Sequence, residues 1–151
     1  MKKVLFVCLG NICRSPMAEF YMKRFVEEKG ASARYEIASA ATSGEEVGSP
    51  VHAGTRRKLA EIGISVSGKT ARRLTAEDGE HYDFIVVMDG RNLRDARRIV
   101  GERAADKVVR LLDFTEDKRD VADPWYTGDF DATFRDVSAG CAALYDFLEG
   151  K

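Results

Sequence analysis

Hydrophobic residues along the chain form uninterrupted runs that are separated by polar segments. Val4–Cys8 and Phe84–Met88 are continuous apolar runs, as is typical of strands covered on both faces of a parallel sheet. Shorter apolar segments at Tyr35–Ala38 and Val108–Leu112 indicate two more strands. The hydrophobic pattern therefore predicts four buried strands.

The segments between these strands have helical spacing. Ser15 followed by Pro16 predicts an N-cap and a first helical residue, and Ser49 followed by Pro50 repeats this pattern before a helix that ends at Gly63. Apolar residues share one face of the first helix at Met17, Phe20, Tyr21 and Phe25.

Two further helices are expected in the second half. Leu93, Ala96 and Val100 lie on one face of a helix closed by Gly101. A long terminal helix is indicated by the spacing of Phe130, Phe134, Val137, Cys141, Leu144 and Leu148.

The alternation of strands and helices predicts an α/β fold. We expect one domain, residues 1–151, built on a doubly wound, parallel, four-stranded sheet of the flavodoxin-like type, with helices on both faces. Ligands of such sheets bind beyond the carboxyl ends of the strands. Cys8, Asp89 and the loop after Leu112 all follow strand ends.

Composition excludes several classes of protein. With 24 basic and 25 acidic residues among 151, the net charge of −1 gives no signal for nucleic acid or for a membrane surface. Three cysteines are too few for a disulfide framework, and the apolar N-terminal run is too short for a signal peptide, so we expect a cytoplasmic protein. Charge is locally uneven: residues 91–110 hold seven basic and three acidic side chains, a pattern typical of a solvated face.

The segment from Cys8 to Ser15 joins the first strand to the first helix and suits an anion. Backbone N–H groups in a tight loop before a helix form a nest for a tetrahedral oxyanion, and Arg14 adds a bidentate guanidinium. The same positive field favours the thiolate of Cys8, which predicts a nucleophile. Ser15 is placed to donate a hydrogen bond to the sulfur and to assist its departure.

Several motifs together resemble the low-molecular-weight protein tyrosine phosphatases. They are the Cys-(x)5-Arg-Ser loop at Cys8–Ser15, then Ser39–Gly44, Val87–Asp89 followed by Asn92-Leu93, and Asp123–Tyr126. The resemblance implies a hydrolase without metal or organic cofactor that forms a cysteinyl-phosphate and releases inorganic phosphate. It implies a phosphotyrosine-containing protein as substrate and makes a tyrosine kinase a candidate partner.

The resemblance also assigns individual residues. Phosphate would be bound by the loop residues Leu9, Gly10, Asn11, Ile12 and Cys13 together with Arg14. Asp123 would protonate the leaving oxygen and then activate water, which agrees with the need of ester cleavage for a general acid. Trp125 and Tyr126 would form an aromatic wall beside the substrate. Asn11 and Ser39 would support the loop, and Asp89 would orient Arg14 or cap the following helix.

This chain departs from many family members at one wall of the cleft. Glu45 stands where an aromatic residue is common, which predicts a more open and acidic rim. Ile12 resembles tyrosine-directed members, whereas related arginine phosphatases carry threonine there, so we favour phosphotyrosine over phosphoarginine. Cys13 is predicted to trap oxidised Cys8 as a reversible disulfide, and Cys141 to lie in the core.

Three other functions fit the same loop. One is a phosphoarginine phosphatase. Another is a thiol-based phosphocarrier or anion-binding module, but Arg14 and Asp123 speak against it because a carrier needs no acid for a leaving group. The third is a thioredoxin-coupled arsenate reductase, which needs a further redox cysteine pair after the third strand. Residues 80–100 contain no cysteine.

Overall fold

The computed structural model describes residues 1–151 and contains one parallel sheet of four strands. The strands are β1 (Lys2–Cys8), β2 (Tyr35–Ala41), β3 (Phe84–Val87) and β4 (Val108–Arg110), in the order β2-β1-β3-β4. All three neighbouring pairs run parallel. This confirms the predicted α/β fold with a doubly wound parallel sheet.

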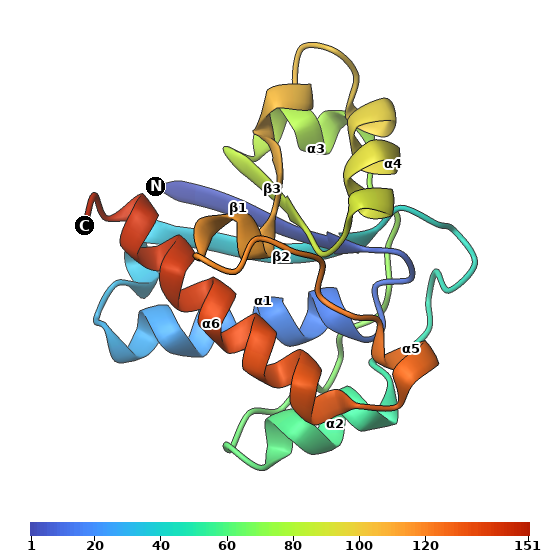
Figure 1. Cartoon of the computed structure of the whole chain (residues 1–151), viewed down its shortest axis with the longest axis vertical. Coiled ribbons are helices and arrows are strands. Elements are labelled where there is room, and N and C mark those ends of the chain that lie inside the picture. Colours follow the sequence, from blue (N-terminus) through green and yellow to red (C-terminus); the bar gives the residue numbers. More distant parts are fainter.

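Helices cover both faces of this sheet (Figure 1). The α-helices are α1 (Arg14–Glu28), α2 (Ala53–Ala60), α3 (Ala76–His81), α4 (Gly90–Val100), α5 (Pro124–Thr127) and α6 (Phe130–Leu148). Short 3-10 segments are η1 (Ser32–Arg34), η2 (Ala105–Lys107) and η3 (Leu111–Phe114). Helices α1 and α6 pack together on one face, and α3 and α4 lie on the other. No helix is long and apolar enough to cross a membrane.

The central strand β1 divides its side chains between two cores. Val4 and Phe6 belong to the core beneath α1 and α6, whereas Leu5 and Val7 belong to the core beneath α3 and α4. All four side chains are fully buried. An uninterrupted apolar run is what a strand needs when successive side chains point to opposite, equally covered faces.

Two predicted strand ends were misplaced. The second strand continues to Ala41 instead of ending at Ala38, since it pairs with β1 along its full length. The fourth strand stops at Arg110, because Leu111 and the residues after it turn into η3. In η3, Leu111 is fully buried against α6. An apolar residue that packs in this way continues the apolar run of the strand, so the run alone could not show where β4 ends.

The predicted helix start at Ser49-Pro50 was wrong. That segment is extended: Pro50 forms a β-bridge with Thr70, and the Ser49 carbonyl accepts from the Ala71 amide. Helix α2 begins three residues later at Ala53, where the Nδ1 atom of His52 accepts the Gly54 amide and caps the helix.

Helix α3 had not been predicted. Its signal is a capping box, in which the Thr75 hydroxyl accepts the Asp78 amide and the Asp78 carboxylate accepts the Thr75 amide.

The close approach of α6 to η3 requires a glycine. A Cβ atom at Gly140 would lie 2.4 Å from Leu111 Cγ. We expect Gly140→Ala to lower the free energy of unfolding by about 1–3 kcal/mol, because the steric clash outweighs the ~1 kcal/mol that alanine normally gains over glycine in a helix. Urea denaturation measures the change. In the control Gly90→Ala the new methyl meets nothing within 4 Å, so stability should hold or rise. Equal behaviour of the two variants would contradict this account of the packing.

Candidate active site

The loop between β1 and α1 leaves its amide groups free. The backbone N–H groups of residues 9–13 make no hydrogen bond to any other backbone group. Buried or half-buried amides are almost always paired in folded proteins, and a run of free ones before a helix is a nest for an anion. The structure therefore presents the donors that the sequence predicted for a tetrahedral oxyanion.

Several carbonyl groups in and next to this loop are held by hydrogen bonds from other segments. The Cys8 and Leu9 carbonyls each accept from the segment after β2, from the amides of Thr42 and Ser43 at 3.0 Å. The Ile12 carbonyl accepts from the His52 amide at 2.8 Å. These contacts fix the loop from outside while its amides stay without a backbone partner.

Cys8 lies at the end of β1 with its sulfur against the first turn of α1. Its Sγ is 3.0 Å from the Ser15 hydroxyl and accepts the Ser15 amide at 3.4 Å. The prediction of Ser15 as N-cap was wrong: α1 begins at Arg14, after Cys13, and has no side-chain cap. The hydroxyl of Ser15 is instead engaged by Cys8 and Asn11.

Asn11 fixes the direction of these hydrogen bonds. Its amide nitrogen donates to the Ser15 hydroxyl at 2.7 Å and to the Ser39 hydroxyl at 2.9 Å, while its oxygen accepts the Arg72 amide at 3.2 Å. Since Ser15 accepts from Asn11, its own proton is available for another acceptor, and the sulfur of Cys8 at 3.0 Å lies nearer than the Ala40 carbonyl at 3.5 Å. Asn11 is also the one non-glycine residue with positive φ, at 58°. The predicted pairing of Asn11 with Ser39 is thus present.

Glu19 completes this network and was missed in the sequence. It is 4% exposed, accepts the Ser39 hydroxyl, and pairs with Lys69 at 3.4 Å and Lys23 at 2.6 Å. Burial lowers the pKa of Lys69. The signal was available, because Glu19 follows Ser15 by four residues and so lies on the same face of α1.

Arg14 is 2% exposed and is held by two carboxylates. Its guanidinium donates to Asp89 at 2.8 Å, to the Val121 carbonyl at 2.8 Å and to Asp123 at 3.4 Å. Burial alone would lower the pKa of Arg14, but the charges of Cys8, Asp123 and Asp89 outweigh it and raise that pKa. Asp89 makes both of the contacts that were expected of it. One carboxylate oxygen accepts from Arg14, and the other accepts the Asn92 amide and caps α4.

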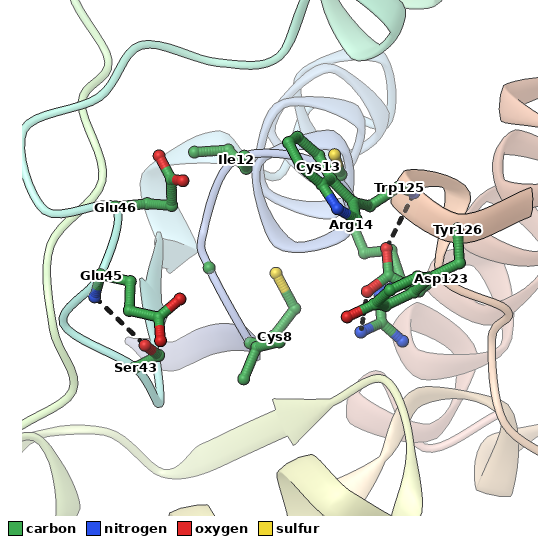
Figure 2. Close-up of a pocket in the computed structure, with 12 residues that line it drawn as sticks. Cys8, Ile12, Cys13, Arg14, Ser43, Glu45, Glu46, Asp123, Trp125 and Tyr126 are labelled. Carbon is green, nitrogen blue, oxygen red and sulfur yellow. Dashed lines mark hydrogen bonds and ion pairs between the residues drawn. The ribbon is translucent and has the colours of Figure 1, made fainter. Parts of the chain in front are cut away.

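Asp123 stands at the start of α5, opposite the phosphate loop. One carboxylate oxygen accepts the Trp125 amide at 3.0 Å and caps this short helix, and the other faces Arg14. Figure 2 shows Cys8 pointing into the cavity, with Asp123 and Tyr126 on one side and Glu45 on the other.

A cavity of about 140 Å³ joins these residues. It is lined by Cys8, Leu9, Gly10, Ile12, Cys13, Arg14, Ser43, Glu45, Glu46, Asp123, Trp125 and Tyr126. The aromatic pair lies at the rim, with Trp125 58% and Tyr126 75% exposed. Ser43 and Glu46 had not been predicted, although both neighbour the predicted Glu45. No group of three or more His, Cys, Asp or Glu side chains is arranged to hold a metal ion.

The three cysteines are free thiols in different surroundings. Cys13 lines the same cavity as Cys8, and burial, reinforced by the charges of Cys8 and Asp123, raises the pKa of its thiol to about 12. Cys141 is fully buried in the core beneath α1 and α6, as predicted.

The arrangement suits nucleophilic transfer of a phosphoryl group. A cysteine sulfur, loop amides without a backbone partner, a buried guanidinium and a carboxylate lie around one small cavity. These are the groups needed to attack phosphorus, to hold its equatorial oxygens and to exchange a proton with the leaving oxygen.

Comparison with known proteins agrees with this geometry. The family described as "Low molecular weight phosphotyrosine protein phosphatase" matches residues 3–151. The low molecular weight protein-tyrosine-phosphatase YfkJ of Bacillus subtilis is 40% identical over 146 residues, covering 95% of this chain and 94% of the relative. The human low molecular weight phosphotyrosine protein phosphatase is 37% identical over 153 residues, covering 98% and 94%.

Solved structures give the same result. The crystal structure of YfkJ from Bacillus subtilis superposes with a TM-score of 0.95 at 39% identity, covering 99% of this chain and 96% of that one. A structure of the phosphatase from Streptococcus pyogenes has a TM-score of 0.87 at 40% identity, with 98% and 93% covered. With sequence, fold and cavity in agreement, the chain belongs to the low-molecular-weight protein tyrosine phosphatases.

Proposed function

We propose that the chain is a cytoplasmic phosphatase that hydrolyses phosphotyrosine through a phosphate ester on Cys8. The observation that carries this proposal is the convergence of Cys8, Arg14 and Asp123 on one cavity whose loop amides are free. Three free thiols support a reducing compartment.

In the first step, Cys8 attacks phosphorus in line with the aryl oxygen. The amides of residues 9–13 and the guanidinium of Arg14 hold the equatorial oxygens. The arriving phosphoryl group replaces Asp123 at Arg14. Asp123, which enters the reaction with a proton taken from solvent, turns to the leaving oxygen and donates that proton. The S–P bond forms, the P–O bond breaks, and a phenol departs.

In the second step, Asp123 takes a proton from water, whose oxygen attacks the phosphocysteine. Inorganic phosphate forms and Cys8 leaves as a thiolate. The Ser15 hydroxyl, with its proton directed to the sulfur by the donation from Asn11, stabilises this departing charge.

The walls of the cavity support an aromatic substrate. Ile12, a residue of the loop itself, contributes an apolar side chain to the cavity wall, and Trp125 and Tyr126 contribute aromatic rings at the rim. A phenyl ring gains from these contacts, whereas the cationic guanidinium of phosphoarginine would be desolvated against Ile12. Glu45 leaves the opposite wall without a ring, so we expect phosphotyrosine to stack on one side only.

A reversible disulfide between Cys8 and Cys13 is the proposed protection against oxidation. Peroxide oxidises the Cys8 thiolate to a sulfenic acid, and the Cys13 sulfur then attacks that sulfur, losing its proton as water leaves. The raised pKa of Cys13, about 12, keeps this second thiol protonated and directs peroxide to Cys8.

The nucleophile is tested by Cys8→Ser. We expect kcat/KM for p-nitrophenyl phosphate to fall at least ~10³-fold, because the hydroxyl is a far weaker nucleophile than the thiolate. Cys141→Ala removes a core thiol and should keep its activity below its melting temperature. Wild-type activity in Cys8→Ser would falsify the mechanism.

The general acid is tested by Asp123→Asn, which keeps a side-chain oxygen to cap α5. We expect kcat/KM to fall ~10²–10⁴-fold for phenyl phosphate and clearly less for p-nitrophenyl phosphate, because the poorer leaving group depends more on the proton. The control Asp117→Asn changes a 71% exposed carboxylate of the same acidic segment and should leave both values unchanged. Equal losses on the two esters would assign Asp123 a structural role instead.

The protective disulfide is tested by exposure to peroxide, removal of peroxide with catalase, and reduction with dithiothreitol. We expect the wild type to regain most of its activity and Cys13→Ser to regain little, because its Cys8 proceeds to irreversible oxidation states. Mass spectrometry before reduction should show a loss of two hydrogens in the wild type. Equal recovery in both proteins would remove this role of Cys13.

A further inference from the structure

A second cleft of about 500 Å³ opens beside the catalytic cavity. Four residues line both, namely Leu9, Ser43, Glu45 and Tyr126, so the two are continuous. Most of the residues that line this cleft come from the loop after β2 and from helix α4. Both segments follow the carboxyl ends of strands (Figure 1). A polypeptide chain that carries a phosphotyrosine in the catalytic cavity would have to leave it along this edge or the opposite one.

The floor of this second cleft contains an unpaired polar group. Thr42 is 6% exposed and lines the cleft, yet its hydroxyl is the one buried side-chain nitrogen or oxygen of the molecule without a hydrogen-bond partner. Buried hydroxyls are nearly always paired, by protein, ligand or water. Because this oxygen is covered by neighbouring atoms, the groups of the cleft that a ligand can reach are the charged side chains of its wall.

The outer wall of the cleft is basic. Arg73, Arg91 and Arg98 line it, and the side chains of Arg91 and Arg98 are 64% and 73% exposed. Asp95 is the only acid on that wall, and it is already shared by Arg91, Arg94 and Arg98. Arg73 forms no ion pair at all, so the wall keeps an excess of uncompensated guanidinium groups.

The negative charge of Glu45 restricts where an acidic ligand can bind. It lines both clefts and forms no ion pair, so it repels negative charge at their junction. The arginines attract negative charge further along. Carboxylates are therefore favoured in the flanking chain and disfavoured immediately beside the phosphotyrosine.

On these grounds we propose that the arginine-lined cleft binds acidic side chains of the polypeptide that flanks the phosphotyrosine. The inference rests on the proposed function and specifies its substrate class: phosphotyrosine within an acidic segment. The charge excess at residues 91–110 then belongs in part to substrate recognition, since Arg91 and Arg98 lie within it. A peptide is favoured over a lipid surface because the cleft adjoins the cavity that would hold the phosphotyrosine, so a flanking chain passes beside the arginines.

The experiment compares three phosphotyrosine peptides that differ only in the flanking residues, which are Glu, Gln or Lys. We expect the wild-type kcat/KM to be about threefold to tenfold higher for the Glu peptide than for the Gln peptide, as two or three partly exposed charge pairs would give. The Lys peptide should be the poorest. The preference should shrink as salt is raised from 50 to 500 mM.

Arg91→Glu combined with Arg98→Glu should abolish or reverse the preference while leaving kcat/KM for p-nitrophenyl phosphate within twofold. The matched control, Arg103→Glu with Arg135→Glu, makes the same change in net charge outside the cleft and should retain the preference. Thermal melting checks that both double variants fold.

Distinct results separate the possible failures. No turnover of any phosphotyrosine peptide would overturn the proposed function itself. Turnover with equal kcat/KM for the Glu and Gln peptides, or a preference that survives the arginine substitutions, would overturn the acidic-segment proposal alone. Binding to phosphatidylserine vesicles that needs Arg91 and Arg98, without any peptide preference, would assign the patch to a membrane and likewise overturn it.

Discussion

The loop after β1 must keep its amides unpaired, and the rest of the site follows from that requirement. Free amides in a half-buried loop are costly, by roughly 1–3 kcal/mol for each donor that finds neither protein nor water. The loop is therefore fixed through its other groups. Neighbouring segments hold its carbonyls, Asn11 ties it to Ser39, and the backbone of Asn11 adopts a left-handed conformation that costs about 1–2 kcal/mol. The three hydrogen bonds of the Asn11 side chain, at about 0.5–1.5 kcal/mol each, can offset that cost.

Charge is balanced around the same loop. A guanidinium as buried as Arg14 would cost several kcal/mol if it were left alone. Asp89 and the Val121 carbonyl hold one end of it permanently, while Asp123 contacts the other end at the longer distance of 3.4 Å. The Nη1 atom, held by Asp89 and Val121, orients the guanidinium of Arg14. The Nη2 atom, which contacts only Asp123, is the one that a phosphoryl group can bind. Asp89 can therefore stay an anchor throughout the reaction while Asp123 changes partner.

The four strands and the loop from Cys8 to Ser15 could be predicted because each is defined by residues that are close together in the sequence. Apolar runs located all four strands, and the segment from Cys8 to Ser15 predicted the loop whose amides lack a backbone partner in the structure. The failures came from interactions between distant segments. Pro50 pairs with Thr70 instead of opening a helix, and Leu111 leaves β4 to pack against α6. Glu19 was missed because an acid on a helix is usually solvated. Its spacing from Ser15 places it on the same face of α1, but its hydrogen bond to Ser39 joins segments that are distant in the sequence.

The hydrogen bonds from Glu19 to Cys8 do not form a path for a proton. Asn11 donates in both directions, so the Ser39 proton points to Glu19 and the Ser15 proton points to Cys8. The polarity reverses at Asn11, and no proton can pass through an amide that donates both of its hydrogens. The network therefore acts by orientation alone. Each hydroxyl accepts a hydrogen from Asn11, and the nearest acceptor for the Ser15 proton is then the sulfur of Cys8, at 3.0 Å against 3.5 Å for the Ala40 carbonyl.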